Sequence, residues 1–273
     1  MVVFPNCKIN IGLNILGKRP DGYHNLQTIF YPINIKDALE IIEAKESVQP
    51  VLFSSSGITL EGNEEDNLCL KAVYLLKKDF PQLSSVQMHL HKNIPVGAGL
   101  GGGSANAAFT IQLLNSQFSL GLTQPQLIKY ATVLGSDCPF FILNKPCYAT
   151  GRGEILEEIS IDFSAYKILL VNPGIHINTA WAFSQLAIKE KARKNLKELI
   201  KQPISTWQQT IVNDFEKPVF AAHPEIASIK NYLYQQGALF ASMSGSGSSI
   251  FGIFEKNNHP TINFPAHYFC RFV

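Results

Sequence analysis

The sequence predicts an α+β protein with two lobes. Strand-like and helix-like segments follow one another in mixed order, without the regular strand–helix alternation that is typical of a parallel α/β sheet. Four strand-like segments come first, then helices around a glycine-rich loop, and the second half mixes both kinds. We place the boundary between the lobes near residue 155, which gives expected domains over 1–155 and 156–273.

The first half begins with an alternating strand. Residues 8–16 place Ile and Leu on one face and Lys, Asn and Gly on the other, which predicts a half-buried strand. Residues 18–22 follow as a turn with Pro20 and Gly22. Asp66 and Asn67 can cap a helix that continues to Phe80. Further strands are expected over 25–33, 38–44, 48–54 and 86–90.

The second half mixes helices and strands. Helices are expected from Gly103 for about a dozen residues and over 124–134, because both segments are rich in apolar helix formers. Short strands are expected over 146–158, and the apolar run 168–171 predicts another. Helical segments near 178–200, 214–222 and 224–236 come next. A strand, the loop 244–248 and a second strand follow.

Composition excludes two classes of protein. The chain has 23 Lys and Arg against 21 Asp and Glu, a net charge of +2, and 46% hydrophobic residues. A disordered chain needs lower hydrophobicity or a higher net charge, and a dedicated nucleic-acid binder is strongly basic. The five cysteines are widely spaced and form no Cys-x-x-Cys pair, which fits a reducing compartment.

No targeting or membrane segment is expected. Residues 1–6 contain no basic region or cleavage site of a signal peptide, so we expect a cytoplasmic protein. Residues 93–128 carry no ionisable side chain, but they contain six glycines and many Asn, Gln and Ser. A membrane span needs about 20 predominantly apolar residues, so this segment is predicted to be soluble and to bind an anion through its backbone.

The glycine-rich loop is the strongest local signal for chemistry. Five glycines in seven positions let backbone N–H groups converge, and the following helix adds its own free N–H groups and dipole. The pattern predicts a polyphosphate site, in which the Ser104 hydroxyl binds a phosphate oxygen or Mg²⁺. A turn without a ligand is disfavoured, since ordering so many glycines costs backbone entropy. The expected cofactor-binding residues are Pro95, Val96, Gly97, Ala98, Gly99, Leu100, Gly101, Gly102, Gly103, Ser104 and Ala105.

Two kinds of phosphate-binding motif can be compared with this loop. A Walker A motif needs Gly-Lys-Ser/Thr, which the chain lacks. Gly97-x-Gly99-x-x-Gly102 satisfies the dinucleotide fingerprint, but that fold also needs an acidic residue about 20 positions later, and the next acid is Asp137. A dinucleotide-dependent oxidoreductase is therefore the alternative rather than the main hypothesis.

Three segments together resemble the GHMP kinase superfamily. They are Cys7–Leu13, Pro95–Ala108 and Ser242–Ser249, which occur in the order of the family's three motifs. The resemblance implies an N-terminal ATP-binding lobe like ribosomal protein S5 domain 2, a ferredoxin-like C-terminal lobe and an active site between them. It also implies an ATP-dependent kinase acting on a small molecule, with ATP and Mg²⁺ as cofactors. Ala105 stands where many family members have Ser.

The segments Arg19–His24 and Gly135–Phe141 narrow the resemblance to one branch of the family. That branch phosphorylates the 2-hydroxyl of a CDP-linked methylerythritol in the non-mevalonate isoprenoid pathway; another GHMP kinase activity is the alternative within the family. A monomer or weak dimer without nucleic-acid or membrane partners is expected. By resemblance, Lys8 and Asp137 are catalytic, and the substrate-binding residues are Asn10, Tyr23, His24, Thr179 and Phe183.

The chemistry of these residues suits the implied roles. The Asp137 carboxylate would accept or orient the proton of the attacking hydroxyl, and the Lys8 ammonium would stabilise phosphoryl charge. Strand alternation places Asn10 on the same side as Lys8. A loop carboxylate and a surface lysine are the structural alternatives for the two catalytic candidates.

Two further patterns are given structural interpretations. His89 and His91 share one strand face and could bind a metal, but no third ligand lies nearby in sequence, so a solvated face is favoured. The basic run 189–201 is interpreted as a solvated helix face rather than a nucleic-acid site.

Overall fold

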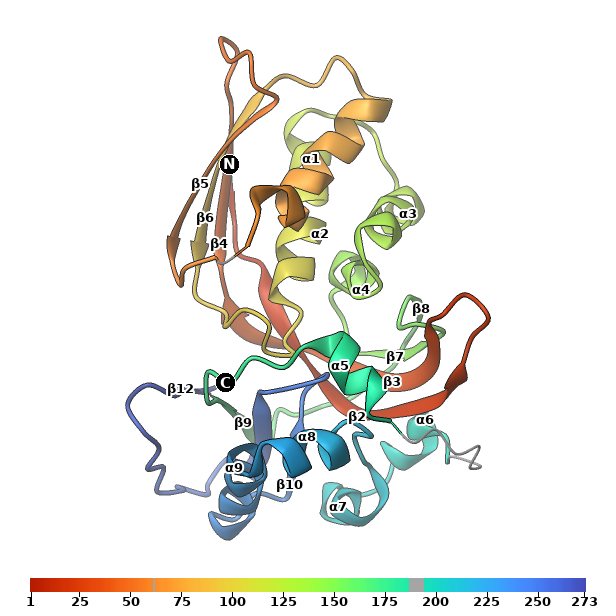
Figure 1. The fold of residues 1–273 in the computed structure, drawn as a ribbon, viewed down its shortest axis with the longest axis vertical. Coiled ribbons are helices and arrows are strands. Elements are labelled where there is room, and N and C mark those ends of the chain that lie inside the picture. Colours follow the sequence, from red (N-terminus) through yellow and green to blue (C-terminus); the bar gives the residue numbers. More distant parts are fainter. Residues whose placement is uncertain (61, 187–193) are drawn as a thin grey trace. The chain divides into compact units, whose positions relative to one another are not determined.

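In the computed structural model, which describes residues 1–60, 62–186 and 194–273, the chain forms two compact units (Figure 1). Unit 1 consists of Met1–Cys7, Asn34–Val96 and Gly101–Lys145. Unit 2 consists of Lys8–Ile33, Gly97–Leu100 and Pro146–Val273. Both units are assembled from separated segments. The division of roles between an ATP-binding lobe over 1–155 and a substrate-binding lobe over 156–273 stays a prediction.

Unit 1 is a four-stranded sheet with helices on one face (Figure 1). The strand order is β1 (Val2–Val3), β4 (Ala38–Glu43), β6 (Val86–Lys92) and β5 (Val51–Gly57), and only the β5–β6 pair of this sheet is parallel. The helices are α1 (Leu68–Asp79), α2 (Gly102–Gln117), α3 (Gln124–Leu134) and α4 (Cys138–Leu143), with a 3₁₀ turn at Glu64–Asp66. Strand residues facing the helices, among them Leu39, Ile41 and Met88, are fully buried, as period-2 alternation requires.

Local signals account for most helices of unit 1. The Asn67 side chain accepts a hydrogen bond from the Cys69 N–H at 2.9 Å, which confirms the expected cap of α1. Helix α3 has the expected bounds and begins with a capping box between Thr123 and Gln126. Helix α4 was not expected. Five of its six residues are buried, so its sequence shows no amphipathic period to read.

Unit 2 contains one four-stranded sheet and most of a second. One has the order β10 (Phe240–Met243), β11 (Ile250–Glu255), β9 (Tyr166–Asn172) and β12 (Phe269–Phe272), with every pair antiparallel. The other has the order β2 (Asn6–Lys18), β3 (His24–Lys36), β7 (Cys147–Thr150) and β8 (Ile155–Glu158). The helices are α5 (Thr179–Ser184), α6 (Leu196–Leu199), α7 (Trp207–Thr210), α8 (Glu216–Ala222) and α9 (Pro224–Gln235), with a 3₁₀ turn at Ile204–Thr206. Among the described helices, none combines the length and the apolarity needed to cross a bilayer.

Strand β2 corrects one expectation. It is present, but residues 6–15 are buried on both faces, so the prediction of a half-buried strand is wrong. Its apolar residues Leu13 and Ile15 join a core cluster with residues of β9, β11 and α9. The side chains of Lys8 and Asn10 are also buried, at 3% and 2% exposure. The alternating pattern of a sequence shows which face of a strand is polar, but not whether that face is exposed. In β2 the polar face is buried as well.

The region 178–200 corrects a second expectation. Helix α5 ends at Ser184, Gln185 and Leu186 are not helical, and α6 begins only at Leu196. A single helix over 178–200 is therefore wrong. Part of the basic run, residues 189–193, lies outside the described residues.

A buried asparagine joins the first and second halves of the chain within unit 2. Asn213 forms a parallel bridge with Leu13 of β2. Its Nδ2 donates to the carbonyl oxygens of Met243 at 2.7 Å and Gly245 at 2.8 Å, and its Oδ1 accepts from the Phe215 N–H at 3.0 Å. The side chain is 3% exposed, so water cannot replace these partners.

Replacing Asn213 by Ala should lower the free energy of unfolding by about 2–3 kcal/mol, because it removes the amide donor that binds two buried carbonyl groups. Urea unfolding monitored by circular dichroism measures the change. Asn258→Ala is the matched control: its Nδ2 also donates to two carbonyls, at 3.3 and 3.2 Å, but at a half-exposed position where water can substitute. Equal losses for the two variants would contradict the argument from burial.

Candidate active site

The first part of the glycine loop, Gly97–Leu100, is fixed within unit 2 by backbone contacts. The Leu100 carbonyl accepts from the Lys8 N–H at 3.0 Å, and the Ala98 carbonyl accepts from the Ser249 N–H at 3.3 Å. Gly99 has φ +77°, and a Cβ at this residue would lie 2.0 Å from the carbonyl oxygen of Ser244. A side chain at residue 99 is therefore excluded by backbone, whether or not a ligand is present.

Lys8 lies against this loop. Its Nζ donates to Asn10 Oδ1 at 2.5 Å and to the Gly99 carbonyl at 3.3 Å, and it lies 4.9 Å from the centre of the Phe30 ring. Asn10 in turn donates from Nδ2 to Thr28 Oγ1 at 2.9 Å. The structure thus brings the predicted residues Lys8, Asn10 and Gly99 together. The surface-lysine alternative is wrong, since buried lysines need specific partners.

The second part of the loop forms the N-terminus of α2 within unit 1. The first bond of the helix runs from the Ala105 N–H to the Gly101 carbonyl at 2.8 Å. The N–H groups of Gly102, Gly103 and Ser104 therefore lie at the open end, where a helix binds anions. Space around Gly103 is open, because a Cβ at this residue would have no heavy atom within 4 Å beyond its own helix and chain neighbours. Ala105 itself is fully buried, so its methyl group packs inside the unit.

Asp137 lies at the start of α4, also within unit 1, and is half-buried. The next residue, Cys138, is hydrogen-bonded to Ser104 in the first turn of α2, so Asp137 is one residue away from that contact. Burial, and to a smaller extent the charge of Asp137, raise the pKa of the Cys138 thiol to about 12. The thiol is therefore neutral at physiological pH and not a nucleophile. The second predicted catalytic residue, Lys8, belongs to unit 2.

The residues predicted to bind the substrate all belong to unit 2. The rings of His24 and Phe183 are stacked, with centres 4.8 Å apart and planes inclined by 14°. Burial and the charge of Lys18 lower the pKa of His24, so its ring is neutral at pH 7 and carries one donor and one acceptor. Thr179 is hydrogen-bonded to Ser246 at 3.0 Å, which places it beside the third motif.

Arg152 is a residue that the sequence analysis missed. Its guanidinium lies 4.7 Å from the centre of the exposed Tyr23 ring, within the range of a cation–π contact. The Glu154 carboxylate also binds the arginine, accepting from its backbone N–H at 2.6 Å and from its Nε at 3.4 Å. A basic residue between two glycines, Gly151 and Gly153, is the only sequence signal that could have indicated it.

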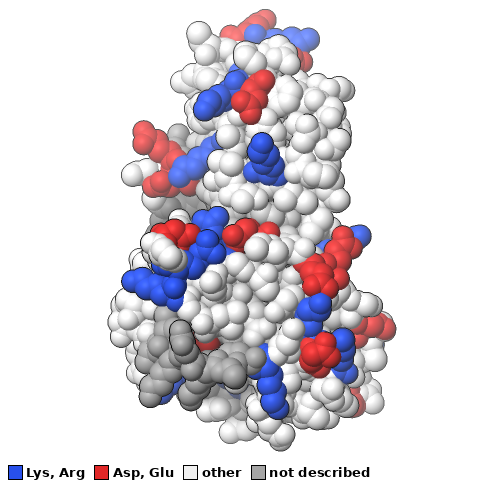
Figure 2. All heavy atoms as spheres, turned by 90° about the vertical axis from the view of Figure 1, so that its right-hand side faces the viewer, with Lys and Arg blue, Asp and Glu red and all other residues white. Residues whose placement is uncertain are grey.

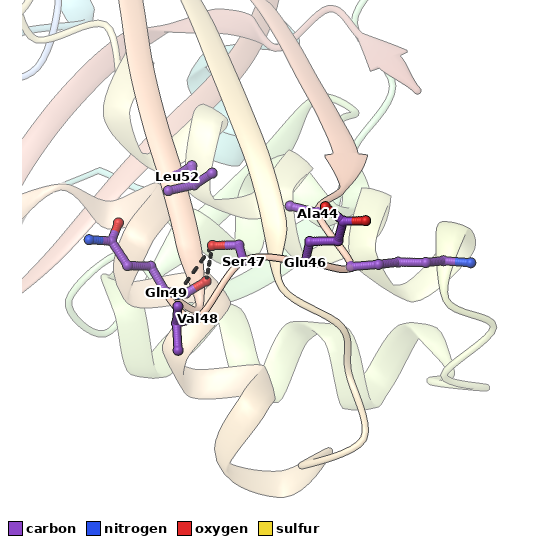
Figure 3. A pocket seen from close by; sticks show the side chains of 7 residues that line it. Ala44, Glu46, Ser47, Val48, Gln49 and Leu52 are labelled. Atoms are coloured by element: carbon purple, nitrogen blue, oxygen red, sulfur yellow. Dashed lines mark hydrogen bonds between the residues drawn. The ribbon is translucent and has the colours of Figure 1, made fainter.

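Other surface features carry no predicted site residue. A hollow in unit 1 is lined by Leu52 and residues 44–49, all from the connection between β4 and β5 or its edge (Figure 3). His89 and His91 are hydrogen-bonded to Ser54 and Ser56 at 2.8–3.0 Å. On the face drawn in Figure 2, acidic and basic side chains are interspersed rather than separated by sign.

Comparison with known families identifies the class of protein to which this fold and glycine loop belong. The model described as GHMP kinases N terminal domain matches residues 67–145, and the model described as GHMP kinases C terminal matches residues 187–261. The chain has the α+β GHMP kinase fold with its N- and C-terminal domains, which confirms the expected fold class. A mevalonate kinase from Methanococcus jannaschii shares the fold, with a TM-score of 0.70 at 15% identity and coverage of 94% of this chain and 92% of that one.

Individual relatives narrow the class. A 4-diphosphocytidyl-2-C-methyl-D-erythritol kinase from Bacteroides fragilis is 50% identical over 96% of this chain and 94% of its own length. One from Bacteroides thetaiotaomicron is 47% identical over 99% and 98%. A crystal structure of a 4-(cytidine 5'-diphospho)-2C-methyl-D-erythritol kinase has a TM-score of 0.79 at 28% identity, covering 92% of this chain and 89% of that one.

The chain belongs to the 4-diphosphocytidyl-2-C-methyl-D-erythritol kinase family within the GHMP kinases. It is an ATP-dependent kinase acting on an alcohol group, as expected. The alternative of a dinucleotide-dependent oxidoreductase is wrong: the loop that satisfies the fingerprint Gly97-x-Gly99-x-x-Gly102 is the glycine motif of a kinase.

Gly103→Ala tests whether phosphates approach the open end of α2. The new methyl group meets no protein atom, and Ala is favoured over Gly in a helix, so stability should be unchanged or raised by up to about 1 kcal/mol. ATP should nevertheless bind at least about tenfold more weakly, a loss of about 1.4 kcal/mol, because the methyl group occupies the approach of the phosphates. Calorimetric titration with MgATP and urea unfolding measure the two quantities. An unchanged ATP affinity would place the phosphates elsewhere.

Proposed function

We propose that this chain transfers the γ-phosphoryl group of ATP to the 2-hydroxyl of 4-diphosphocytidyl-2-C-methyl-D-erythritol. The relatives at 45–50% identity all bear the name of that kinase, and they match almost the whole chain. The single structural observation that supports catalysis best is Lys8, a buried cation whose Nζ is 3.3 Å from the Gly99 carbonyl of the phosphate loop. A cytoplasmic location and a monomeric or weakly dimeric state stay predictions.

The proposed mechanism uses Asp137, Lys8 and the N-terminus of α2. The alcohol oxygen attacks the γ-phosphorus, the bond from that phosphorus to the β,γ-bridging oxygen breaks, and ADP leaves with the electron pair. The proton of the hydroxyl passes to the Asp137 carboxylate, acting as general base. The Lys8 ammonium stabilises negative charge on the transferring group, and the N–H groups at the start of α2 hold the phosphates.

The residues present fit a magnesium ion that accompanies ATP. Mg²⁺ prefers oxygen ligands and is commonly held by one or two carboxylates together with phosphates. The hydroxyl of Ser104 and the carboxylate of Asp137 are such donors, and the contact between Ser104 and Cys138 places them near each other within unit 1. When bound, the ion would neutralise phosphate charge, while Ser104 orients the loop end and Asp137 takes the proton.

A substrate panel tests the proposal directly. ADP release should be measured with MgATP and, separately, the CDP-linked methylerythritol, mevalonate, homoserine and galactose. The proposal requires ADP release with the CDP-linked alcohol at a kcat/KM far above the others. Turnover only with mevalonate, homoserine or galactose would leave a GHMP kinase with another substrate.

Asp137→Asn should lower kcat by about 10²–10⁴-fold while ATP still binds, because the variant cannot take up the proton. Lys8→Ala should slow the same step. In the double variant the two losses should be far from additive, since both residues serve one transition state. Steady-state kinetics of the four proteins, with calorimetric ATP titration as the binding control, give the result. Near-normal kcat for Asp137→Asn, or fully additive losses, would refute the assignment of both residues to one step.

Base selectivity should depend on His24. A site that hydrogen-bonds a base edge rejects a base that leaves its polar groups unpaired, whereas stacking tolerates any base. His24→Ala should therefore lower the ratio of kcat/KM for the CDP-linked substrate over its UDP analogue. The neighbouring Tyr23→Ala is the matched control, since loss of a stacking ring should weaken both substrates alike. An intact ratio in His24→Ala would mean that other groups read the base.

A further inference from the structure

A buried carboxylate in unit 1 contacts both ends of the phosphate-binding loop. Asp37, which lies between β3 and β4, is 1% exposed. Its Oδ1 accepts from the backbone N–H groups of Asn93 and Ile94, each at 2.8 Å, and these residues lead into the loop. Its Oδ2 accepts from Nδ2 of Asn106 in α2 at 2.9 Å, on the far side of the loop. One side chain thus fixes the two stems between which the glycines lie.

The same carboxylate is paired with Lys92, the last residue of β6. The Lys92 ammonium is hydrogen-bonded to Asp37 Oδ2, and both side chains are almost completely buried. A Cβ at Gly102, the first residue of α2, would lie 2.9 Å from Lys92 Nζ. The ammonium therefore lies directly against the N-terminus of the helix.

This position is electrostatically unusual for a cation. The N-terminus of a helix carries partial positive charge, so a neighbouring ammonium is destabilising there, and burial adds a desolvation penalty. Hydrophobic side chains of similar volume often stabilise a protein more than a buried ion pair does. A polyphosphate bound at the same helix end would make the electrostatic contribution of Lys92 favourable, because the phosphates would be attracted both by the helix dipole and by the ammonium.

We propose that Asp37, Lys92 and Asn106 form a positioning cluster for the nucleotide, in which Asp37 holds the loop stems and Lys92 adds positive charge behind the helix end. This proposal rests on the ATP use of the family and not on the identity of the alcohol substrate. None of the three side chains is exposed by more than 3%, so they act through the loop and its field rather than by touching substrate. We therefore expect the cluster to raise the affinity for nucleotides more strongly the more phosphates they carry.

The test separates charge from folding. Lys92→Met alone leaves Asp37 as an uncompensated buried charge and should lower the urea midpoint. The double variant Asp37→Asn/Lys92→Met is neutral, and the amide oxygen introduced at position 37 can still accept from the two loop N–H groups while Asn106 flips to accept in turn. We expect the double variant to regain most of the urea midpoint, but to bind ATP about tenfold more weakly than the parent, which corresponds to about 1.4 kcal/mol.

Nucleotides with different numbers of phosphates give a readout that a purely structural role would not move. Dissociation constants for AMP, ADP and ATP should be measured by calorimetry, and the preference for ATP over AMP should fall in the double variant. The control Glu157→Gln/Lys197→Met removes an exposed ion pair and, like the buried double variant, leaves the net charge unchanged; it should leave that preference intact.

An unchanged ATP-over-AMP preference in a folded double variant would overturn the proposal, even if AMP and ATP both bound more weakly. If the double variant does not fold, Lys92→Gln replaces it, since the amide can still donate to Asp37 without the charge; the same preference is then decisive. Because these measurements use no alcohol substrate, they stand or fall independently of the proposed kinase substrate.

Discussion

The close approach of two backbone segments in unit 2 is the constraint that fixes the surroundings of Lys8, a predicted catalytic residue. The Ser244 carbonyl lies 2.0 Å from where a Cβ of residue 99 would be, and a Cβ at Gly245 would lie 3.1 Å from the Gly99 backbone. The Ser244 hydroxyl donates to the Gly99 carbonyl at 2.8 Å and accepts from the Asn10 N–H at 3.2 Å. Strand β2, the loop residues Gly97–Leu100 and the third motif, Ser242–Ser249, are therefore fixed relative to one another. These contacts also fix the position of Lys8, which lies in β2.

In both units, buried polar side chains are hydrogen-bonded to groups of particular loops. In unit 2, Asn213 donates to the carbonyl of the last residue of β10, Met243, and to that of Gly245 in the following loop. Asn172 donates to the hydroxyls of Ser248 and Ser249 at 3.1 Å. In unit 1, Asp37 accepts from two backbone N–H groups. An unpaired buried polar group costs more than a paired one contributes, so such side chains specify one loop conformation rather than adding much net stability.

Local signals in the sequence predicted a large part of the fold. Asn67 and the residues 124–134 carry caps and periodicity within a few positions, so the beginning of α1 and the bounds of α3 could be predicted. The glycine loop could be located too, because its glycines adjoin one another. The partners of Asp37 lie 55 to 69 positions away in the sequence, and no local sequence pattern predicts them. The burial of Lys8 and the existence of α4 depend likewise on what the rest of the chain packs against them.

The segmented composition of unit 2 also has a consequence for the order in which the chain can fold during synthesis. Unit 1 has all its residues once Lys145 has left the ribosome. In contrast, Leu13, Ile15 and Leu26, made early, share a core cluster with Leu233 and Phe254, which are made close to the end of the chain. Contacts so distant in sequence form late, because the loop between them must close first. The residues of β2 and β3 in this cluster therefore stay uncovered for most of translation, when a nascent chain is most exposed to aggregation and to chaperones.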